Sequence, residues 1–352
     1  MTGYDYGNAR LRARKSRFLL TSDYQALLGA SDLDGLLGLL SGTHYGPDIE
    51  AVLPRLRSIR RLDGAVTHNV GRTLEEMSSF YTDQAGRAVA LLLERWDLRN
   101  VQAVLRGIAA HAAPADIAAT LVPAGTIPGA VLRSLTGAAD LRTLLDLLVS
   151  LGVPSARHAA RLLEAWPAYT HSSDAAVLEY ALHQVYAARW AAELADLDLS
   201  PLSLVFRRET DRANVLAALR LVALSTDATS DLVEQHRWLD GRLDRDTLMA
   251  AATASGPEEA ADLLIPLVPT SWGEALRRWA ADRDTARVAL DIDVAITREL
   301  ISLFTSGDPL GIDIPVAFTA MLENEARNVR YVARSVASGR PAADTLAGLV
   351  MP

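Results

Sequence analysis

The stretch "LLLERWDLRNVQAVLRG", residues 91–107, places an acid and an amide inside a helical pattern of apolar residues. At 100° per residue, Leu93 and Val104 fall on one helix face. Asp97 lies near the middle of that face, and Asn100 lies at its edge. A buried carboxylate is costly unless it is paired or hydrogen-bonded. The stretch therefore predicts a buried helix whose acid has a specific partner.

The same pattern recurs twice further along the chain. "DLRNVQAVLR" begins at Asp97, "DRANVLAALR" at Asp211 and "EARNVRYVAR" at Glu325, so both intervals are 114 residues. An asparagine and an arginine keep the same interval after each acid: Asn100, Asn214, Asn328, Arg106, Arg220 and Arg334. Self-similarity at a fixed spacing indicates a repeat architecture. We take these nine residues as structural repeat positions.

A weaker echo precedes each copy. "SDLDGLLGLLSG" and "ADLRTLLDLLVSLG" both run from an acid and a leucine into a leucine-rich helix and then a break, and "AADLLIPLVP" is a candidate third copy. The chain therefore divides into three related helical units, residues 1–112, 113–230 and 231–352. We expect these units to form one compact assembly.

The rest of the chain is also helical in pattern. "AVLEYALHQVYAARWAAEL" and "ITRELISLF" keep apolar residues three and four positions apart. Breaks fall at "SGTHYGPD", "HAAPAD", "VPAGTIPG", "LDLSPLS", "ASGPEE" and "TSGDPLGIDIP". No alternating β pattern with hairpin turns occurs. We predict an all-α chain without a straight membrane-spanning helix, because the longest uncharged stretch, Ile117–Leu132, contains Pro123 and Pro128.

Composition and motifs exclude several function classes. The 352 residues are 50% hydrophobic and carry a net charge of −8, which argues against a general nucleic-acid binder. The absence of cysteine excludes disulfides, thiolate catalysis and Cys-zinc sites. The single lysine, Lys15, lies outside any glycine loop, which excludes a P-loop and a direct nucleotide site of that kind. The seven histidines lack metal-ligand spacing. We predict no catalytic residue, cofactor or metal.

The three acids allow two interpretations. In one, each carboxylate is a polar clamp that meets an arginine, a tyrosine or a helix N-terminus of a neighbouring helix. In the other, the acids lie around an axis and hold a cation or a basic partner. We favour the clamp, because positions kept in all units of a repeat usually serve the fold that the units share.

The start of the chain, "NARLRARKSRFLL" at residues 8–20, is strongly basic. Its cations are Arg10, Arg12, Arg14, Lys15 and Arg17. They could contact anionic lipid heads or an acidic partner. Alternatively, they surround a helix whose Leu11, Phe18 and Leu19 pack inward, with some arginines as partners of the repeat acids. Nothing in the start resembles a signal peptide, since no apolar core follows the charges.

Three features together resemble the C subunit of the archaeal and bacterial V/A-type rotary ATPases, the counterpart of the d subunit of the eukaryotic vacuolar ATPase. They are "YGNARLRARKS" at 6–16, the three acid-x-x-Asn-Val helices, and "ENEARNVRYVARSVASGRP" at 323–341. The resemblance runs from near residue 4 to near residue 345. The sequence departs from the family pattern in the Pro- and Gly-rich "VPAGTIPGAVL" and at Arg207 and Arg208, where apolar residues are expected.

The resemblance implies a funnel-shaped protein of three similar helical units around a pseudo-threefold axis. It implies a non-catalytic, cofactor-free member of the central stalk, peripheral to the membrane on its cytoplasmic face. The expected partners are the membrane proteolipid ring and the rotor shaft subunits D and F, whose lower end enters the funnel. Two alternatives remain from the residues alone: a helical-repeat scaffold or adaptor unrelated to rotary ATPases, and an enzyme that uses the three acids as a metal site.

Overall fold

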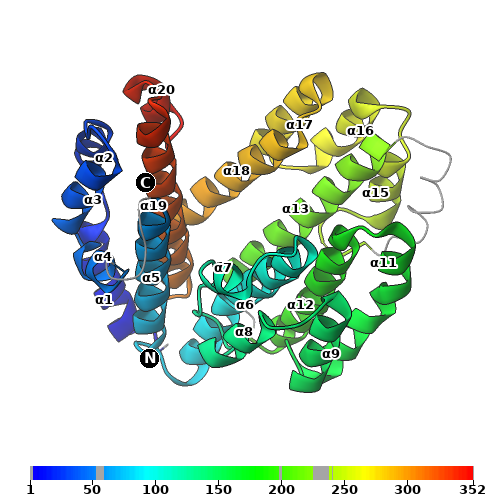
Figure 1. The fold of residues 1–352 in the computed structure, drawn as a ribbon. Helices are drawn as coiled ribbons and strands as arrows, with labels where there is room; N and C mark the ends of the chain where they lie inside the picture. The colour runs from blue at the N-terminus through cyan, green and yellow to red at the C-terminus, as the bar shows by residue number, and fades with distance from the viewer. Residues whose placement is uncertain (1–2, 53–58, 198–199, 225–237, 240, 352) are drawn as a thin grey trace. The chain divides into compact units, whose positions relative to one another are not determined.

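The computed structural model describes residues 3–52, 59–197, 200–224, 238–239 and 241–351 (Figure 1). Every regular element in these residues is a helix, which confirms the prediction of an all-α chain. The chain forms two compact units. One comprises Met1–Glu193 with Ile301–Pro352, and the other comprises Leu194–Leu300.

The helices fall into three sets along the chain. The first set is α1 Asp5–Arg14, η1 Lys15–Arg17, α2 Thr21–Leu28, α3 Leu33–Ser41, α4 Gly46–Val52 and α5 Ile59–Ser78. The second is α6 Asp83–Ala109, α7 Pro114–Ala118, α8 Gly129–Leu135, α9 Leu141–Leu151, α10 Ala156–Ala159, η2 Ala160–Ala165, α11 Trp166–Ser172 and α12 Ala175–Leu197. The third is α13 Ser200–Leu224, α15 Arg245–Ala252, α16 Pro257–Leu264, η3 Ile265–Leu267, α17 Thr270–Asp282 and α18 Thr285–Ser306. The chain ends with α19 Asp313–Ser338 and α20 Ala342–Ala347.

The order of these helices repeats. Short helices lead to a long one (α5, α12 and α18), and a second long helix (α6, α13 and α19) follows each. The repeat acids Asp97, Asp211 and Glu325 lie on these second long helices. The 114-residue interval therefore coincides with a repeated order of elements. The ranges 1–112, 113–230 and 231–352 remain a prediction.

Each acid-bearing helix packs against short helices. Helix α6 contacts α8 and α9, and α13 contacts α15 and α16, which in both cases follow it in the chain. Helix α19 has few residues after it, and it packs instead against α2, α3 and α5 near the start of the chain. Figure 1 shows α19 beside α5. We call α1–α5 with α19 and α20 the first bundle, α6–α12 the second bundle and α13–α18 the third bundle.

Aspartates begin one short helix in each bundle. The Oδ1 atom of Asp32 accepts a hydrogen bond from the Gly35 amide at 2.8 Å and caps α3. Asp140 caps α9 in the same way through Thr143, and Asp244 caps α15 through Thr247. These caps satisfy amides that the first turn of a helix leaves unpaired. The echo "SDL" and "ADL" seen in the sequence corresponds to the first two of these caps.

The long helix α6 is more deeply buried than an amphipathic pattern predicts. All residues from Leu91 to Leu98 are buried, including Glu94 and Arg95, so neighbouring helices surround this part of α6. The helical wheel predicted correctly that Asp97 lies on a buried face. It predicted burial on one face only, whereas α6 is buried on all sides from Leu91 to Leu98. Charged residues in this segment therefore need partners inside the protein.

Candidate functional site

Asp97 is held by the loop that precedes α8. Its side chain is 1% exposed. Its Oδ2 atom accepts hydrogen bonds from the Thr126 amide at 2.6 Å and from the Thr126 hydroxyl at 2.8 Å, and Oδ1 accepts from the Ile127 amide at 3.1 Å. One turn away, the Asn100 side chain donates to the Val122 carbonyl at 2.7 Å and accepts from the Val122 amide at 2.8 Å. The loop "VPAGTIPG" is thus fixed to α6 at two points.

Asp211 does the same in the third bundle. It is 4% exposed, and its Oδ1 atom accepts hydrogen bonds from the Arg242 amide at 2.7 Å and the Leu243 amide at 3.4 Å. The Asn214 side chain donates to the Leu239 carbonyl at 2.9 Å and accepts from the Leu239 amide at 3.0 Å. The acid and the amide of the repeat therefore fasten the loop before α15 to α13.

Glu325 binds the start of the chain instead of a loop that follows it. It is 3% exposed, and its Oε2 atom accepts a hydrogen bond from the Leu19 amide at 2.5 Å. Its Oε1 atom accepts from the Tyr45 hydroxyl at 3.1 Å and lies 3.0 Å from His44 Nε2. The Asn328 side chain donates to the Val350 carbonyl at 2.9 Å. The last acid-bearing helix is therefore fastened to the short helices at the start of the chain.

The three carboxylates share one contact. Each accepts a hydrogen bond from the amide of the residue directly before a helix N-cap: Ile127 before α8, Leu243 before α15 and Leu19 before α2. The backbone supplies this contact, so the loops need no common sequence. We call these three arrangements the carboxylate clamps. Five of their six oxygens, all except Oδ2 of Asp211, accept hydrogen bonds within the described residues, which favours the clamp interpretation over a cation site.

Two glycines make close approach to the carboxylates possible. A Cβ atom on Gly125 would lie 2.1 Å from the Oδ1 atom of Asp97. A Cβ atom on Gly241 would lie 2.2 Å from the Oδ1 atom of Asp211. Both distances are far below van der Waals contact. The stretch "VPAGTIPGAVL" departs from the family pattern, and its Gly125 is explained by this close packing against Asp97.

The repeated arginines lie outside the clamps. Arg106 is exposed and forms a bidentate pair with Glu179 on α12 at 2.8 and 2.7 Å. Arg220 and Arg334 are also exposed. Among the described residues, the ion pair of the N-terminal basic segment joins Arg14 to Glu76 and not to a repeat acid. The segment reaches Glu325 through the backbone of Leu19, whose side chain packs inward.

A second repeated position lies three residues before each acid. In the second bundle Glu94 forms a bidentate pair with Arg189 on α12, at 2.7 and 2.9 Å. In the third bundle Arg208 forms a bidentate pair with Glu299 on α18, with both distances 2.7 Å. This pairing accounts for Arg208, one of the departures from the apolar pattern. The sequence shows the charges but not the partner helix, so these pairs could not be predicted from it.

Burial raises the pKa of Asp97, and the hydrogen bonds from Thr126 and Ile127 only partly oppose it. Burial likewise raises the pKa of Asp211 against hydrogen bonds from Arg242 and Leu243. The folded protein therefore keeps a proton on each acid at pH values where the unfolded chain has released it. The free energy of unfolding therefore falls as pH rises from about 3.9, the ordinary aspartate pKa, to above the raised pKa of the folded protein. Below that range the extra bound protons stabilise the folded state, and above it this contribution is lost.

We expect Asp97→Asn to remove part of this pH dependence. The stability of the wild type minus that of the variant should fall with rising pH, by at most about 1.4 kcal/mol per pH unit inside the window. Asp140→Asn is a control of opposite sign, because the amide of Thr143 lowers the pKa of Asp140. Urea unfolding across about pH 3–7 measures both differences. A difference for Asp97 that rises with pH would contradict the assignment.

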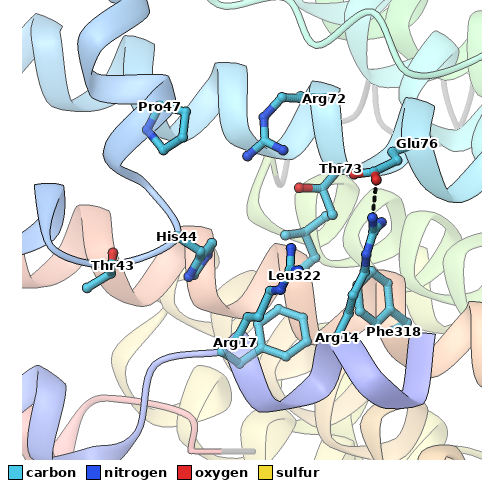
Figure 2. A pocket seen from close by; sticks show the side chains of 11 residues that line it. Arg14, Arg17, Thr43, His44, Pro47, Arg72, Thr73, Glu76, Phe318 and Leu322 are labelled. Carbon is cyan, nitrogen blue, oxygen red and sulfur yellow. Dashed lines mark hydrogen bonds and ion pairs between the residues drawn. The ribbon is translucent and has the colours of Figure 1, made fainter. Parts of the chain in front are cut away.

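Position 322 in the first bundle breaks the pattern of ion pairs. Leu322 occupies the place of Glu94 and Arg208 and lines a cavity of about 430 Å³. Figure 2 shows this cavity, with Arg14, Arg17, His44 and Arg72 among its lining side chains. The first bundle therefore has a cation-lined cavity at the position where the other bundles have an internal pair.

The described part of the chain contains no candidate metal centre. Neither the clamps nor any other group of three or more acidic or histidine side chains there could hold a metal ion. No helix in the same ranges is both long and apolar enough to cross a membrane.

Two of the three known proteins named here resemble this chain over almost its whole length. The family model described as "ATP synthase (C/AC39) subunit" matches residues 7–347. The C subunit of the V-type ATP synthase of Thermus thermophilus is 27% identical over 99% of this chain and 99% of its own length. The C subunit of the A-type ATP synthase of Thermococcus kodakarensis is 23% identical over 96% of this chain and 88% of its own length. The C subunit of the V-type ATP synthase of Deinococcus radiodurans is 29% identical over 61% of this chain and 59% of its own length.

Proposed function

Because the chain belongs to the family of ATP synthase C/AC39 subunits, we propose that it is a non-catalytic central-stalk subunit of a V/A-type ATPase or ATP synthase. In this role it is a socket. It receives the end of the rotor shaft, subunits D and F, and couples the shaft to the membrane proteolipid ring for ion transport. The observation that carries the proposal is the family match over residues 7–347. This range covers nearly the whole chain and includes all three clamps.

We also propose that the three bundles surround a pseudo-threefold axis and form a funnel. Three alike clamps support this arrangement. The clamp at Asp97 fastens α6 to the short helices after it, and Asp211 does the same for α13. The clamp at Glu325 fastens the last long helix to the first short helices. A repeat that fastens its last copy to its first has no open end, whereas a linear repeat leaves both ends uncovered.

A socket transmits torque only if it resists deformation by the shaft. Buried carboxylates with backbone partners are suited to this, because breaking one leaves polar groups unpaired in the interior. The bidentate pair of Glu94 with Arg189 adds a link between two long helices. The mechanism is therefore mechanical, with binding at the shaft and ring through interface burial and complementary charge.

The proposal includes a location at the cytoplasmic face of the membrane, peripheral to it, as part of the ATPase complex. The family supports this location, since its members carry the names of ATP synthase subunits. Family membership also disfavours an unrelated scaffold or adaptor. An enzyme with the acids as a metal site is disfavoured by their hydrogen bonds to backbone amides.

The test is removal of this subunit from membranes that contain the complex. ATP hydrolysis by the soluble head should persist, while ATP-driven proton or sodium pumping should be abolished, because shaft rotation no longer reaches the ring. Proton or sodium uptake into vesicles and phosphate release measure the two activities. Adding back the purified chain should restore pumping, and the purified chain alone should hydrolyse no ATP.

Pumping at normal stoichiometry without this subunit would refute the central-stalk proposal. A direct binding assay separates the two contacts. The purified chain should be retained by immobilised D–F shaft subunits and by detergent-solubilised ring. Retention by neither would refute the socket role even if pumping were lost.

A further inference from the structure

We propose that the exposed side of α1 binds an acidic helix of a partner protein. Helix α1 packs against the rest of the first bundle through its buried residues Gly7, Asn8 and Leu11. Its other residues are exposed or half-buried, and Ala9 and Ala13 lie one turn apart at the centre of the exposed side. We call this side the α1 face. No element of the described residues covers it.

Cations lie at both edges of the α1 face. At one edge the guanidinium carbon of Arg10 lies 4.6 Å from the ring centroid of Phe80. At the other edge the guanidinium carbon of Arg12 lies 5.8 Å, and Nζ of Lys15 4.9 Å, from the ring centroid of Phe304. At 100° per residue Arg10 and Arg12 are about 160° apart around the helix. The exposed face therefore lies between two positively charged edges.

Within the described ranges these three cations form no ion pair with an acid. The acids nearby have other roles. Glu76 pairs with Arg14. The carboxylate of Asp308 accepts a hydrogen bond from the Leu310 amide at 2.9 Å. Asp5 lies in the first turn of α1, where the N-terminus of a helix favours an acid. The charge at the two edges therefore favours a partner that supplies carboxylates.

The rings below the cations hold them in place. Phe80 and Phe304 are buried side chains, so a cation over either ring is fixed to the body of the first bundle. An arginine held in this way retains N–H donors for a carboxylate, and Arg10 uses one of its donors on the Tyr6 hydroxyl. Donors that are positioned before binding lose less conformational entropy when a partner binds.

The centre of the α1 face favours a helix over a membrane surface. Ala9 and Ala13 have short side chains, so a second helix can lie close to α1 between the charged edges. Acids along both sides of that helix would meet the cations, as charged residues flank the contact in paired helices. A helix that lies on a bilayer inserts several large apolar side chains. Helix α1 exposes only one large side chain with apolar surface, Tyr6.

The experiment uses the full chain and two stapled, fluorescently labelled helical peptides of the same composition. One peptide carries glutamates along both edges of an alanine face, and the other carries all its glutamates along one edge. Circular dichroism checks that both are helical, and fluorescence anisotropy measures binding. The two-edged peptide should bind saturably, and the one-edged peptide should bind about tenfold more weakly. Added salt should weaken both, because the contacts are between exposed charges.

Charge variants test the two edges separately. Arg10→Gln and Arg12→Gln should each weaken the two-edged peptide by about threefold to fivefold, the effect of one exposed charge pair. Arg133→Gln is the matched control, because it removes an exposed arginine of α8 in the second bundle. It should leave the affinity unchanged.

A size variant tests the centre of the α1 face without changing its charge. Ala13→Leu should weaken the two-edged peptide at least tenfold, because the larger side chain keeps the two helices apart. Ala26→Leu makes the same change at an exposed position of α2 and should have no effect. General attraction between an acidic peptide and a basic surface would not respond to Ala13→Leu.

Three results would each overturn the proposal. They are no saturable binding of the two-edged peptide, equal affinity for the two peptides, and an unchanged affinity in Ala13→Leu. Vesicles containing phosphatidylglycerol test the membrane alternative. Vesicle binding that is lost in Arg10→Gln and Arg12→Gln, without binding of either peptide, would assign the α1 face to a membrane surface instead. None of these results bears on ion pumping, so the proposal stands or falls separately from the central-stalk function.

Discussion

Replacing Asp97 with alanine should lower the free energy of unfolding by about 3–5 kcal/mol, the range for breaking a buried charged contact. The change leaves the amides of Thr126 and Ile127 and the hydroxyl of Thr126 without their acceptor. An unsatisfied buried donor costs about 1–3 kcal/mol, so the loss of three explains a value in this range. Differential scanning calorimetry and urea unfolding of the full chain measure it.

Two further variants separate the clamp from a general effect of removing an acid. Asp97→Asn retains one carbonyl acceptor and should cost less than Asp97→Ala. Asp116→Ala removes an exposed acid that pairs with exposed Arg60 and should change stability by less than about 1 kcal/mol. If Asp97→Ala unfolds like the Asp116 variant, the clamp does not stabilise the protein.

The sequence was sufficient for the fold class and for the positions of the buried acids. The constant interval singled out Asp97, Asp211 and Glu325, and the structure buries all three. It also singled out the asparagines, and in two copies the side-chain amide pairs with both the N–H and the C=O of one residue, a double pairing that few side chains can replace. Asn100 with Val122 and Asn214 with Leu239 show this double pairing.

The partners of the acids could not be predicted from residue types. The clamps use backbone amides, and every residue except proline has one. The loops at Thr126, Arg242 and Leu19 therefore share a position relative to a helix start and no sequence motif. The contact of Glu325 with Leu19 joins residues 306 positions apart, and a period that counts forward along the chain cannot indicate it.

For the repeated arginines, the constant interval suggested a shared role that the structure does not show. Arg106, Arg220 and Arg334 keep the interval but are exposed, so a shared position does not imply a shared contact. The cavity was missed for a related reason. It depends on Leu322, an apolar residue in an apolar helix, and only comparison with the ion pairs at the equivalent positions of the other bundles shows that this position differs.

Replacing Gly125 with alanine should destabilise the protein nearly as much as removing the Asp97 carboxylate. The new Cβ atom would lie 2.1 Å from Oδ1, and the three nearest atoms all belong to Asp97. Overpacking typically costs about 1–3 kcal/mol, and displacement of the carboxylate adds the loss of its hydrogen bonds. Gly38→Ala is the matched control, since no atom outside the nearby backbone of α3 lies within 4 Å of its Cβ position. It should be neutral or slightly stabilising.

The double variant gives the sharper result. If the cost of Gly125→Ala arises from the Asp97 carboxylate, the same substitution should cost little in the Asp97→Ala background, because the atoms it meets are gone. The two changes should then be strongly non-additive, with a coupling energy of more than about 1 kcal/mol. Gly241→Ala with Asp211→Ala tests the third bundle independently, since Oδ1 of Asp211 lies 2.2 Å from that Cβ position. Additive effects in both pairs would mean that the glycines serve the loop conformation, and the close approach of loop to carboxylate would not be the reason that glycine occupies these positions.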